Sequence, residues 1–330
     1  MKLGTALIEG RDTLIAAIGD TGAVTLSAAY QAAGLGAVPA SLNDLIEAGP
    51  DELSRARGAV ETAAANGVSM LRVADIDFRP PQPRPTKFMG VAMNNRGIRK
   101  EAHKSPTVPN YFLKAPSCLT GHNHPIIMKE HYGETIPELE LAAVIGKRAK
   151  NVSVEEARDV IFGYSIANDI TSHGIKFGYD SIATTRAPEL TRPHHFAWRN
   201  RHGEDDNDIY FVYHTRSKAT DTFGPMGPWI TTADEIANPN TLDVRGYFNG
   251  EPFAQDNTSN YMFTVEQVIA DASEWFTLEP GDIIIFGTTA KGVGKYPHGH
   301  REINMHKMNG LIECEIEGLG KLANRVVHEK

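Results

Sequence analysis

Short apolar runs, bounded by glycine, proline or charged residues, recur along the chain from residue 87 onward. The clearest of these runs are 87–93, 140–146, 160–167 and 282–288. Apolar runs of this length between breakers are typical of β-strands and are short for a packed helix. The pattern therefore predicts a C-terminal region that consists mainly of strands.

Two segments of the same region have helical features. Residues 263–276 place apolar side chains at helical spacing, and residues 152–161 form a shorter candidate. Each begins with a Ser or Thr that is followed three residues later by Glu or Gln, which is the spacing of a capping box. These pairs are Ser153 with Glu156 and Thr264 with Gln267. We expect both segments to form capped helices.

The N-terminal part of the chain, residues 1–79, is rich in alanine and glycine. Ser41 can cap a first helix, which the Gly-Pro pair at 49–50 interrupts. Asp51 can then cap a second helix that ends near Gly67. We expect a small α+β domain here.

A proline-rich segment, RPPQPRP at 79–85, separates this part from the rest. Such a composition favours extended backbone with few hydrogen bonds, as in a linker. We therefore expect a linker at 80–85 and a second, larger domain at 86–330. Within the larger domain, the polar stretch 174–216 is interpreted as an insertion or a lid. Long loops are uncommon in compact domains and often have a function.

The composition narrows the classes of protein that fit. A chain of 330 residues corresponds to about two domains. Hydrophobic residues make up 41% and charged residues 22%, as in ordinary globular proteins. The net charge of −8 argues against a protein that binds nucleic acid. No apolar stretch approaches the roughly 20 residues of a membrane span, and the first residues do not resemble a secretory signal. Two distant cysteines favour free thiols and a cytoplasmic location.

The strongest chemical signal is the sequence PELEL at 137–141. Glu138 and Glu140 are two residues apart in a predicted strand, so their side chains share one face. Asp169 ends another apolar run and offers a third carboxylate. Unpaired buried carboxylates are costly, and Mg²⁺, Mn²⁺ or Ca²⁺ would compensate them. On spacing alone, an alternative is a half-solvated strand whose glutamates pair with nearby basic residues at 147–148.

Further motifs then reveal a family resemblance. The segments that carry it are 137–171 (PELELAAVIGKRAKNVSVEEARDVIFGYSIANDIT), 218–236 (KATDTFGPMGPWITTADEI), 249–263 (NGEPFAQDNTSNYMF), 277–294 (TLEPGDIIIFGTTAKGVG) and 311–326 (LIECEIEGLGKLANRV). In this order, they resemble the motifs of the fumarylacetoacetate hydrolase family. The resemblance covers about 86–326 and identifies this part as the catalytic domain of a two-domain member.

The resemblance implies an α+β fold, mainly β, in which a mixed β-sandwich roll forms the catalytic domain. It also implies that Glu138, Glu140 and Asp169 hold a divalent metal. Members of the family commonly form homodimers or larger homo-oligomers. They act on small 2-oxo or 2,4-dioxo acids, and their reactions include hydrolysis, decarboxylation, isomerisation and dehydration.

The resemblance also indicates how a substrate would be bound. Lys218 matches a family lysine that faces the substrate, where it can donate to an oxyanion beside the metal. Thr288, after Gly287, matches a threonine near the substrate carboxylate. Gln255 is a candidate contact at the mouth of the site.

The chain departs from the family pattern in the lid that carries the water-activating His–Glu pair of hydrolytic members. Asn94 and Glu101 fit the asparagine and the glutamate of that pattern. The tyrosine position is Asn95, and the histidine position is Ile98. His103 is a candidate replacement base if the lid is rearranged.

A second departure follows Asp169. The family usually has an arginine and a glutamine where this chain has His173 and Lys176. A titratable imidazole is not equivalent to a fixed guanidinium. His173 is therefore a candidate acid or base, and Lys176 a candidate contact to a different substrate group. Alternatively, both have moved to the surface together with the insertion.

Together these features favour a cytoplasmic hydrolase that depends on a divalent metal ion, Mg²⁺ or alternatively Mn²⁺ or Ca²⁺. Its reaction would cleave a carbon–carbon bond in an acylpyruvate-like 2,4-dioxo acid, as in aromatic or sugar-acid catabolism, and release pyruvate or a related 2-oxo acid plus a carboxylic acid. The alternatives are a 2-oxo-3-deoxy sugar-acid dehydratase, a decarboxylase or an isomerase on the same scaffold. A non-catalytic metal- or ligand-binding relative is a third possibility, against which Glu138, Glu140, Asp169 and Lys218 argue.

Overall fold

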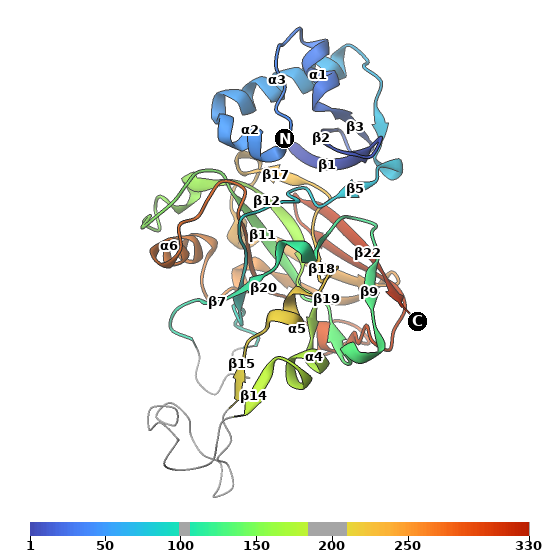
Figure 1. Cartoon of the computed structure of the whole chain (residues 1–330), viewed down its shortest axis with the longest axis vertical. Helices are drawn as coiled ribbons and strands as arrows, with labels where there is room; N and C mark the ends of the chain where they lie inside the picture. Colours follow the sequence, from blue (N-terminus) through green and yellow to red (C-terminus); the bar gives the residue numbers. More distant parts are fainter. Residues whose placement is uncertain (99–105, 184–209, 330) are drawn as a thin grey trace, which may run out of the picture.

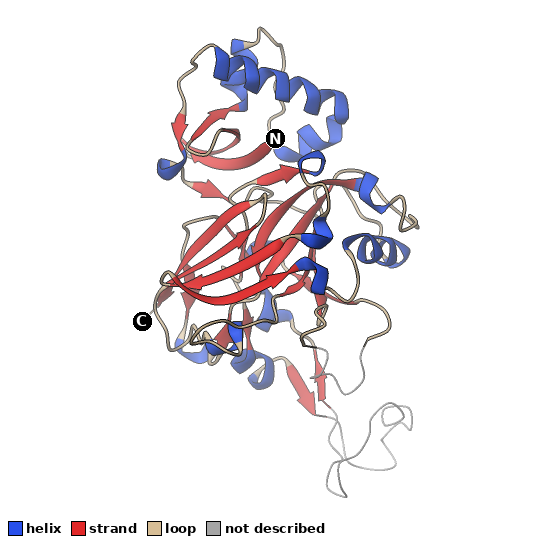
Figure 2. Ribbon diagram, turned by 180° about the vertical axis from the view of Figure 1, so that it is seen from behind, coloured by secondary structure: helices blue, strands red, loops and turns tan. Residues whose placement is uncertain are grey.

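Two β-sheets form most of the protein, as the computed structural model of residues 1–98, 106–183 and 210–329 shows. Figure 1 shows the N-terminal part above the remaining strands, and Figure 2 shows the broad strands from behind. This sheet-dominated α+β architecture confirms the expected fold class. Among the described residues, no helix is both long and apolar enough to cross a membrane.

The larger sheet runs through both parts of the chain. In spatial order its strands are β4 (Leu71–Arg72), β3 (Gly22–Thr25), β2 (Arg11–Ile18), β1 (Lys2–Ile8), β17 (Ile230–Thr232), β12 (Ile161–Asn168), β11 (Leu139–Ile145), β20 (Ile283–Thr288), β6 (Phe88–Ala92) and β7 (Asn110–Lys114), with β5 (Phe78–Arg79) also paired to β1. The antiparallel pairing of β1 with β17 joins the N-terminal strands to the rest.

A second sheet packs against the larger one. Its strands in spatial order are β19 (Glu251–Asn257), β18 (Asp243–Phe248), β21 (Leu311–Ile316), β22 (Gly320–His328) and β9 (Ile126–Met128). The core lies between the two sheets, where β12 contacts β21 and β22, and β11 contacts β18. Every residue of β11 is buried, so this central strand is a rigid support for side chains at its ends.

Short strand pairs and helices complete the fold. The pairs are β10 (Thr135–Ile136) with β13 (Thr171–Ser172), β14 (Ser181–Ala183) with β15 (Tyr210–Val212), and β16 (Gly224–Pro225) with β8 (Leu119–Thr120). The helices are α1 (Leu26–Ala32), α2 (Leu42–Ala48), α3 (Pro50–Ala65), α4 (His173–Gly178), α5 (Thr215–Ala219) and α6 (Val265–Trp275). The four strands expected in the C-terminal region are confirmed as β6, β11, β12 and β20, within two residues at each end.

The helix predictions had mixed outcomes. Helix α6 has the expected capping box. The predicted helix at 152–161 is wrong, because only Ala157–Val160 form a short 3₁₀ turn. The hydrogen bonds between Ser153 and Glu156 do form, but they close a local turn. In the N-terminal part, Asp51 does not cap α3, since the helix already begins at Pro50, whose fixed φ suits the first helical position.

The proline-rich segment is packed against both parts of the chain. Gln82 is buried, and its amide donates to Asn43 and to the carbonyl of Gly281. In the expected insertion, α4 and β14 precede the segment 184–209, and β15 and α5 follow it. The segment itself lies outside the described residues. Figure 1 shows α4, α5, β14 and β15 grouped at one end of the sheets.

Candidate metal centre

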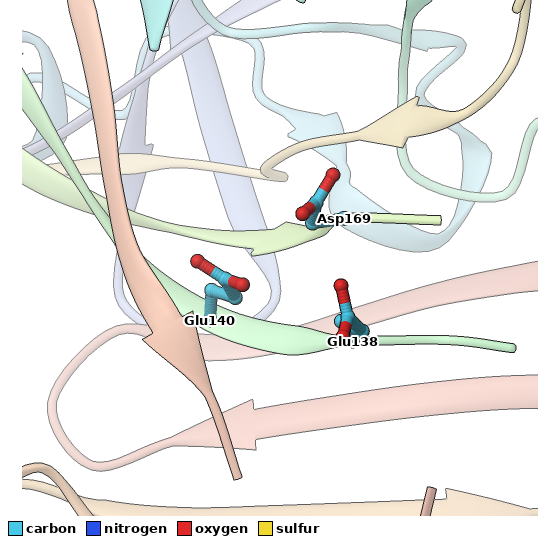
Figure 3. Close-up of side chains that lie close together, drawn as sticks. All are labelled: Glu138, Glu140 and Asp169. Carbon is cyan, nitrogen blue, oxygen red and sulfur yellow. The ribbon is translucent and has the colours of Figure 1, made fainter. Parts of the chain in front are cut away.

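Three carboxylates meet at the end of the central strands. Glu138 immediately precedes β11, Glu140 lies within it, and Asp169 immediately follows β12. One potential ligand oxygen of each lies within 4.8 Å of the others. Figure 3 shows both glutamates projecting from the same side of their strand toward Asp169. The antiparallel pairing of β11 with β12 sets this geometry, because Leu139 lies opposite Asn168.

Backbone and side-chain hydrogen bonds fix Glu138 and Asp169 relative to each other. The N–H of Asp169 donates to the carbonyl of Glu138 at 2.7 Å. The N–H of Glu138 donates to Oδ1 of Asn168 at 3.0 Å. In addition, the hydroxyl of Thr171 donates to Oε2 of Glu138 at 2.6 Å. The two carboxylates are therefore held in place by their own strands.

The negative charge of Glu140 is the least compensated of the three carboxylate charges. Its Oε2 accepts a hydrogen bond of 2.6 Å from the N–H of Gly287. Burial, followed by the charges of Asp169 and Glu138, raises the pKa of Glu140 well above its ordinary value. Gly287 has a φ of +110°, which a residue with a side chain rarely adopts. The glycine therefore allows its N–H to face Glu140.

Lys218 bridges the other two carboxylates. Its Nζ lies 2.5 Å from Oε2 of Glu138 and 2.5 Å from Oδ2 of Asp169. Although burial acts in the opposite direction, these contacts raise the pKa of Lys218 above its ordinary value. Burial also opposes the lowering of the Glu138 pKa, which falls to about 2, mainly because of Lys218. Glu138 and Lys218 therefore form an ion pair in which both groups are charged at neutral pH.

A second lysine, Lys114 at the end of β7, contacts the far side of Asp169. Its Nζ lies 2.6 Å from Oδ1 of Asp169, and both side chains are fully buried. The same ammonium donates to the carbonyl oxygens of Lys218 and Phe223. The ring of Phe112 lies beneath Lys218, with its centroid 4.6 Å from Nζ. Two of the three carboxylates, Glu138 and Asp169, are thus paired with two lysines.

Thr288 lies directly across the strand pair from Glu140. Its side-chain hydroxyl is buried and has no hydrogen-bond partner among the described residues. Its carbonyl accepts a hydrogen bond from the amide of Asn95, which also donates to Asp256. Asn95, at the position expected for a tyrosine, therefore fixes the end of β20 beside the carboxylates.

His173 and Lys176 lie on α4, within electrostatic range of the cluster. Burial lowers the pKa of His173, while the charges of Lys176 and Lys218 act in the same direction and Glu138 opposes them. Burial also lowers the pKa of Lys176, followed by the effect of Lys218. Both side chains are half-buried.

Of the remaining predicted residues, Gln255 is described by the structure and is not brought into the cluster. Gln255 is exposed on β19, and no contact of its side chain with the carboxylates is found among the described residues. Its neighbour Asp256 faces the site instead and accepts from Asn95. Glu101 and His103 lie outside the described residues. Ile98 is buried, so the position expected for the lid histidine carries an apolar side chain.

Sequence reasoning missed several residues around the cluster. Lys114 ends an ordinary strand, and nothing in its local pattern predicts a buried ion pair. Thr171 follows Asp169 by two residues, and this spacing could have indicated a shared face. His300 influences Glu138 electrostatically from a loop far along the sequence. His214, at the start of α5, is a further histidine near Lys218.

The donor set fits a hard divalent cation. Its ligand atoms are carboxylate oxygens, which Mg²⁺, Mn²⁺ and Ca²⁺ prefer. Glu140 is 3% exposed and has no cationic partner among the described residues, so a metal ion would supply the missing positive charge. Glu138 retains 17% of its side-chain exposure. The cluster is therefore accessible from the side of Glu138.

Comparisons with known proteins identify the family of the chain. The family model described as fumarylacetoacetate (FAA) hydrolase C-terminal matches residues 87–327. The chain is 30% identical over 291 residues to the mitochondrial oxaloacetate tautomerase FAHD2A of Bos taurus, covering 88% of this chain and 81% of the relative. It is 34% identical over 247 residues to the uncharacterized protein PYRAB13970 of Pyrococcus abyssi, and this match covers 74% of this chain and 92% of the relative.

A solved structure is similar over its whole length. Maleylpyruvate hydrolase from Sphingobium sp. SYK-6, in complex with manganese(II) ion and pyruvate, is 27% identical with a TM-score of 0.69, and the match covers 100% of both chains. The matched range includes the three carboxylates, Lys218 and Thr288. The chain belongs to the fumarylacetoacetate hydrolase family.

Proposed function

We propose that the protein is a divalent-metal-dependent hydrolase that cleaves a carbon–carbon bond in an acylpyruvate-like 2,4-dioxo acid. The products would be pyruvate or a related 2-oxo acid and a carboxylic acid. The observation that carries the proposal is the buried cluster of Glu138, Glu140 and Asp169 beside Lys218. Relatives named as a hydrolase and as tautomerases support oxo-acid chemistry in general.

Each group around the cluster has a role in this proposal. When bound by the three carboxylates, Mg²⁺ or Mn²⁺ would polarise the 2-oxo group of the substrate. The ammonium of Lys218 would donate to the oxygen on which negative charge develops. The unpartnered hydroxyl of Thr288 would donate to the substrate carboxylate, because a buried hydroxyl without a partner is costly unless a ligand satisfies it.

The charges favour a substrate with a second carboxylate. Lys176 is half-buried, makes no ion pair among the described residues, and lies within electrostatic range of Lys218. A distal carboxylate would relieve the repulsion between the two ammonium groups. Maleylpyruvate and oxaloacetate, which the relatives' names specify, are both dicarboxylates. Lys176 would therefore bind the end of the substrate that lies away from the metal.

The test is turnover of paired acylpyruvates, one with a neutral and one with a carboxylate distal end, with and without Mg²⁺ or Mn²⁺. Loss of enol absorbance and release of pyruvate are followed together. We expect metal-dependent hydrolysis and a preference for the dicarboxylate that Lys176→Met abolishes. No pyruvate from any substrate, with metal bound, would contradict the hydrolase proposal.

Isomerisation of an oxo acid is the second candidate, and the buried Ile98 at the position of the lid histidine favours it. Interconversion of enol and keto forms needs proton transfer but no water activated for attack. The relative named oxaloacetate tautomerase is consistent with this candidate. Enol loss without release of pyruvate or a carboxylic acid in the same assay would identify it.

A homodimer and a cytoplasmic location complete the proposal. The exposed apolar side chains of Phe177, Tyr179, Ile182 and Tyr213 form the kind of surface that subunit contacts cover. Light scattering after size exclusion, in the presence of metal, measures the mass in solution. A mass of about 72 kDa, twice that of one 36.1 kDa chain, is expected. The mass of a single chain would contradict the dimer.

A further inference from the structure

His214 lies at the junction of β15 and α5, in a backbone conformation that is uncommon for it. Its φ is 53° and its ψ is 9°, in the left-handed region. It occupies the capping position of α5, but its side chain makes no capping hydrogen bond. Its carbonyl accepts from the N–H of Lys218 at 3.2 Å. Such strained residues often occur at functional sites.

The imidazole of His214 has an unused nitrogen. Its Nδ1 is buried and has no hydrogen-bond partner among the described residues. Burial, followed by the charges of Lys176 and Lys218, lowers the pKa of His214 to about 4, while Asp180 and Asp169 act in the opposite direction. The ring is therefore neutral at physiological pH and can accept a proton. The ring lies within electrostatic range of Lys176 and Lys218.

A merely structural role does not account for this nitrogen. A capping histidine would hydrogen-bond to the first turn of α5, and a supporting histidine would bind a backbone carbonyl or a carboxylate. For comparison, Nε2 of His124 lies 2.6 Å from Oδ1 of Asp77. A buried, unpaired nitrogen beside a site is instead available to a substrate or to a water molecule.

We propose that the imidazole of His214 is the acid–base group of this site, in place of the lid histidine that this chain lacks. The assignment rests on the proposed oxo-acid chemistry. A carboxylate bound to Lys176 would offset one of the two ammonium charges near the ring. Substrate binding would thereby restore part of the basicity that His214 loses in the free protein.

In the proposed hydrolysis, His214 transfers one proton from water to the 2-oxo acid product. His214 takes a proton from water while the water oxygen forms a bond to the C4 carbonyl carbon of the dioxo acid. The bond between C3 and C4 then breaks, and its electron pair passes to the 2-oxo acid fragment as an enolate. The proton returns from the imidazolium to C3. One water molecule is consumed, and a 2-oxo acid and a carboxylic acid are formed.

The test compares His214→Asn and His214→Gly with His124→Asn as the matched control. Asparagine and glycine both tolerate the left-handed backbone, so the fold is retained, as the melting temperature will verify. Two reactions are measured with Mg²⁺: hydrolysis of acylpyruvates, and exchange of the C3 protons of pyruvate in heavy water, followed by NMR. Exchange requires only that a base removes and returns a proton at C3.

We expect both His214 variants to lose about 100- to 10,000-fold in exchange rate, the usual range for an acid–base group. The KM for pyruvate should change little in these variants. The exchange rate of His124→Asn should match that of the wild type. Free imidazole in the buffer should restore exchange to His214→Gly, which a structural role would not predict. Exchange rates near that of the wild type in both variants would overturn the proposal.

The two reactions separate this proposal from the function on which it rests. Exchange that depends on His214, without hydrolysis of any acylpyruvate, would support His214 and reject the hydrolase. Hydrolysis that survives in both variants would support the hydrolase and reject His214. Neither reaction in the wild type, with metal bound, would reject both.

Discussion

The Nζ of Lys114 lies 2.6 Å from Oδ1 of Asp169, and neither side chain is exposed. Lys218 contacts the other oxygen of the same carboxylate. Asp169 is therefore held between two ammonium groups, one of which lies at the site and one beneath it. Lys114 balances a charge that the site needs without occupying the position where a substrate would bind.

Replacing Lys114 by methionine should destabilise the metal-free protein. Removing one partner of a buried ion pair leaves an uncompensated charge and costs about 3–5 kcal/mol. Unfolding in denaturant, without metal, measures this loss. Lys129→Met is the control, since the ion pair of Lys129 with Glu329 is exposed and should contribute little to stability. Equal effects of the two variants would contradict the role of Lys114.

Replacing Gly90 by alanine should disturb the ring beneath Lys218. A Cβ at this position would lie 2.2 Å from Cζ of Phe112, so the ring has to move. We expect a fall in stability of about 1–3 kcal/mol and a lower kcat, because Lys218 loses its support. Gly58→Ala in α3 has open space around it and should stabilise instead. Unchanged turnover in Gly90→Ala would show that Phe112 does not position Lys218.

Much of the site could be predicted from the sequence because it depends on strand periodicity. The spacing of Glu138 and Glu140 places both on one side of their strand, and the paired strand brings Asp169 to them. Helix α6 was equally predictable, since its capping box and its apolar spacing agree. The glutamate spacing and the helix are determined by residues close together in the sequence, whereas the role of Asp169 as a third ligand was implied by the family resemblance.

Lys114 and His214 could not be predicted in this way. Lys114 reaches Asp169 through packing between segments far apart in the sequence. His214 precedes the helix that carries Lys218, and no periodic pattern in the sequence distinguishes it. The helix at 152–161 was predicted wrongly because a local signal was present but the surrounding fold overrode it. The capping bonds of Ser153 formed as expected, but the backbone then entered β12 instead of continuing as a helix.

Replacing Thr288 by valine should separate binding from stability. The buried hydroxyl has no partner among the described residues, so its removal should leave the free energy of unfolding unchanged or raise it slightly. KM for the oxo acid should rise by roughly 10-fold or more, as expected for a lost hydrogen bond to a charged group. Thr231→Val, which removes another unpartnered buried hydroxyl, should leave KM unchanged. An unchanged KM in Thr288→Val would contradict its role in binding.

Stability should fall in acid because of His122. Its Nδ1 accepts a hydrogen bond from the N–H of Ala323, which a protonated ring cannot do. Burial, followed by the charge of His124, lowers the pKa of His122 from 6.5 to about 4. A lowered pKa gives stability that is complete above pH 6.5 and is lost as the pH falls through about 4.

The free energy of unfolding should fall by at most about 3 kcal/mol because of His122. This follows from about 1.4 kcal/mol per pKa unit, reduced by some screening by solvent. Denaturant unfolding between pH 7 and 4 measures it. In His122→Gln, whose amide oxygen can accept the same hydrogen bond, this part of the pH dependence should disappear. The same slope in both proteins would assign the acid sensitivity to other groups.

Direct titration of the metal-free protein with Mn²⁺ tests the central claim that the carboxylate cluster holds a divalent cation. Glu140→Gln keeps an oxygen that can accept from the N–H of Gly287 and removes one of three crowded negative charges. It should therefore fold at least as stably as the wild type without metal. Glu130→Gln, at an exposed position, is the control.

We predict one Mn²⁺ per chain in the wild type and in Glu130→Gln, measured by calorimetry. In Glu140→Gln the affinity should be weaker by roughly 100-fold or more, since even changes outside the ligand shell cost 10- to 100-fold. Equal affinity for Mn²⁺ in the wild type and in a folded Glu140→Gln would contradict the assignment of the metal to this cluster.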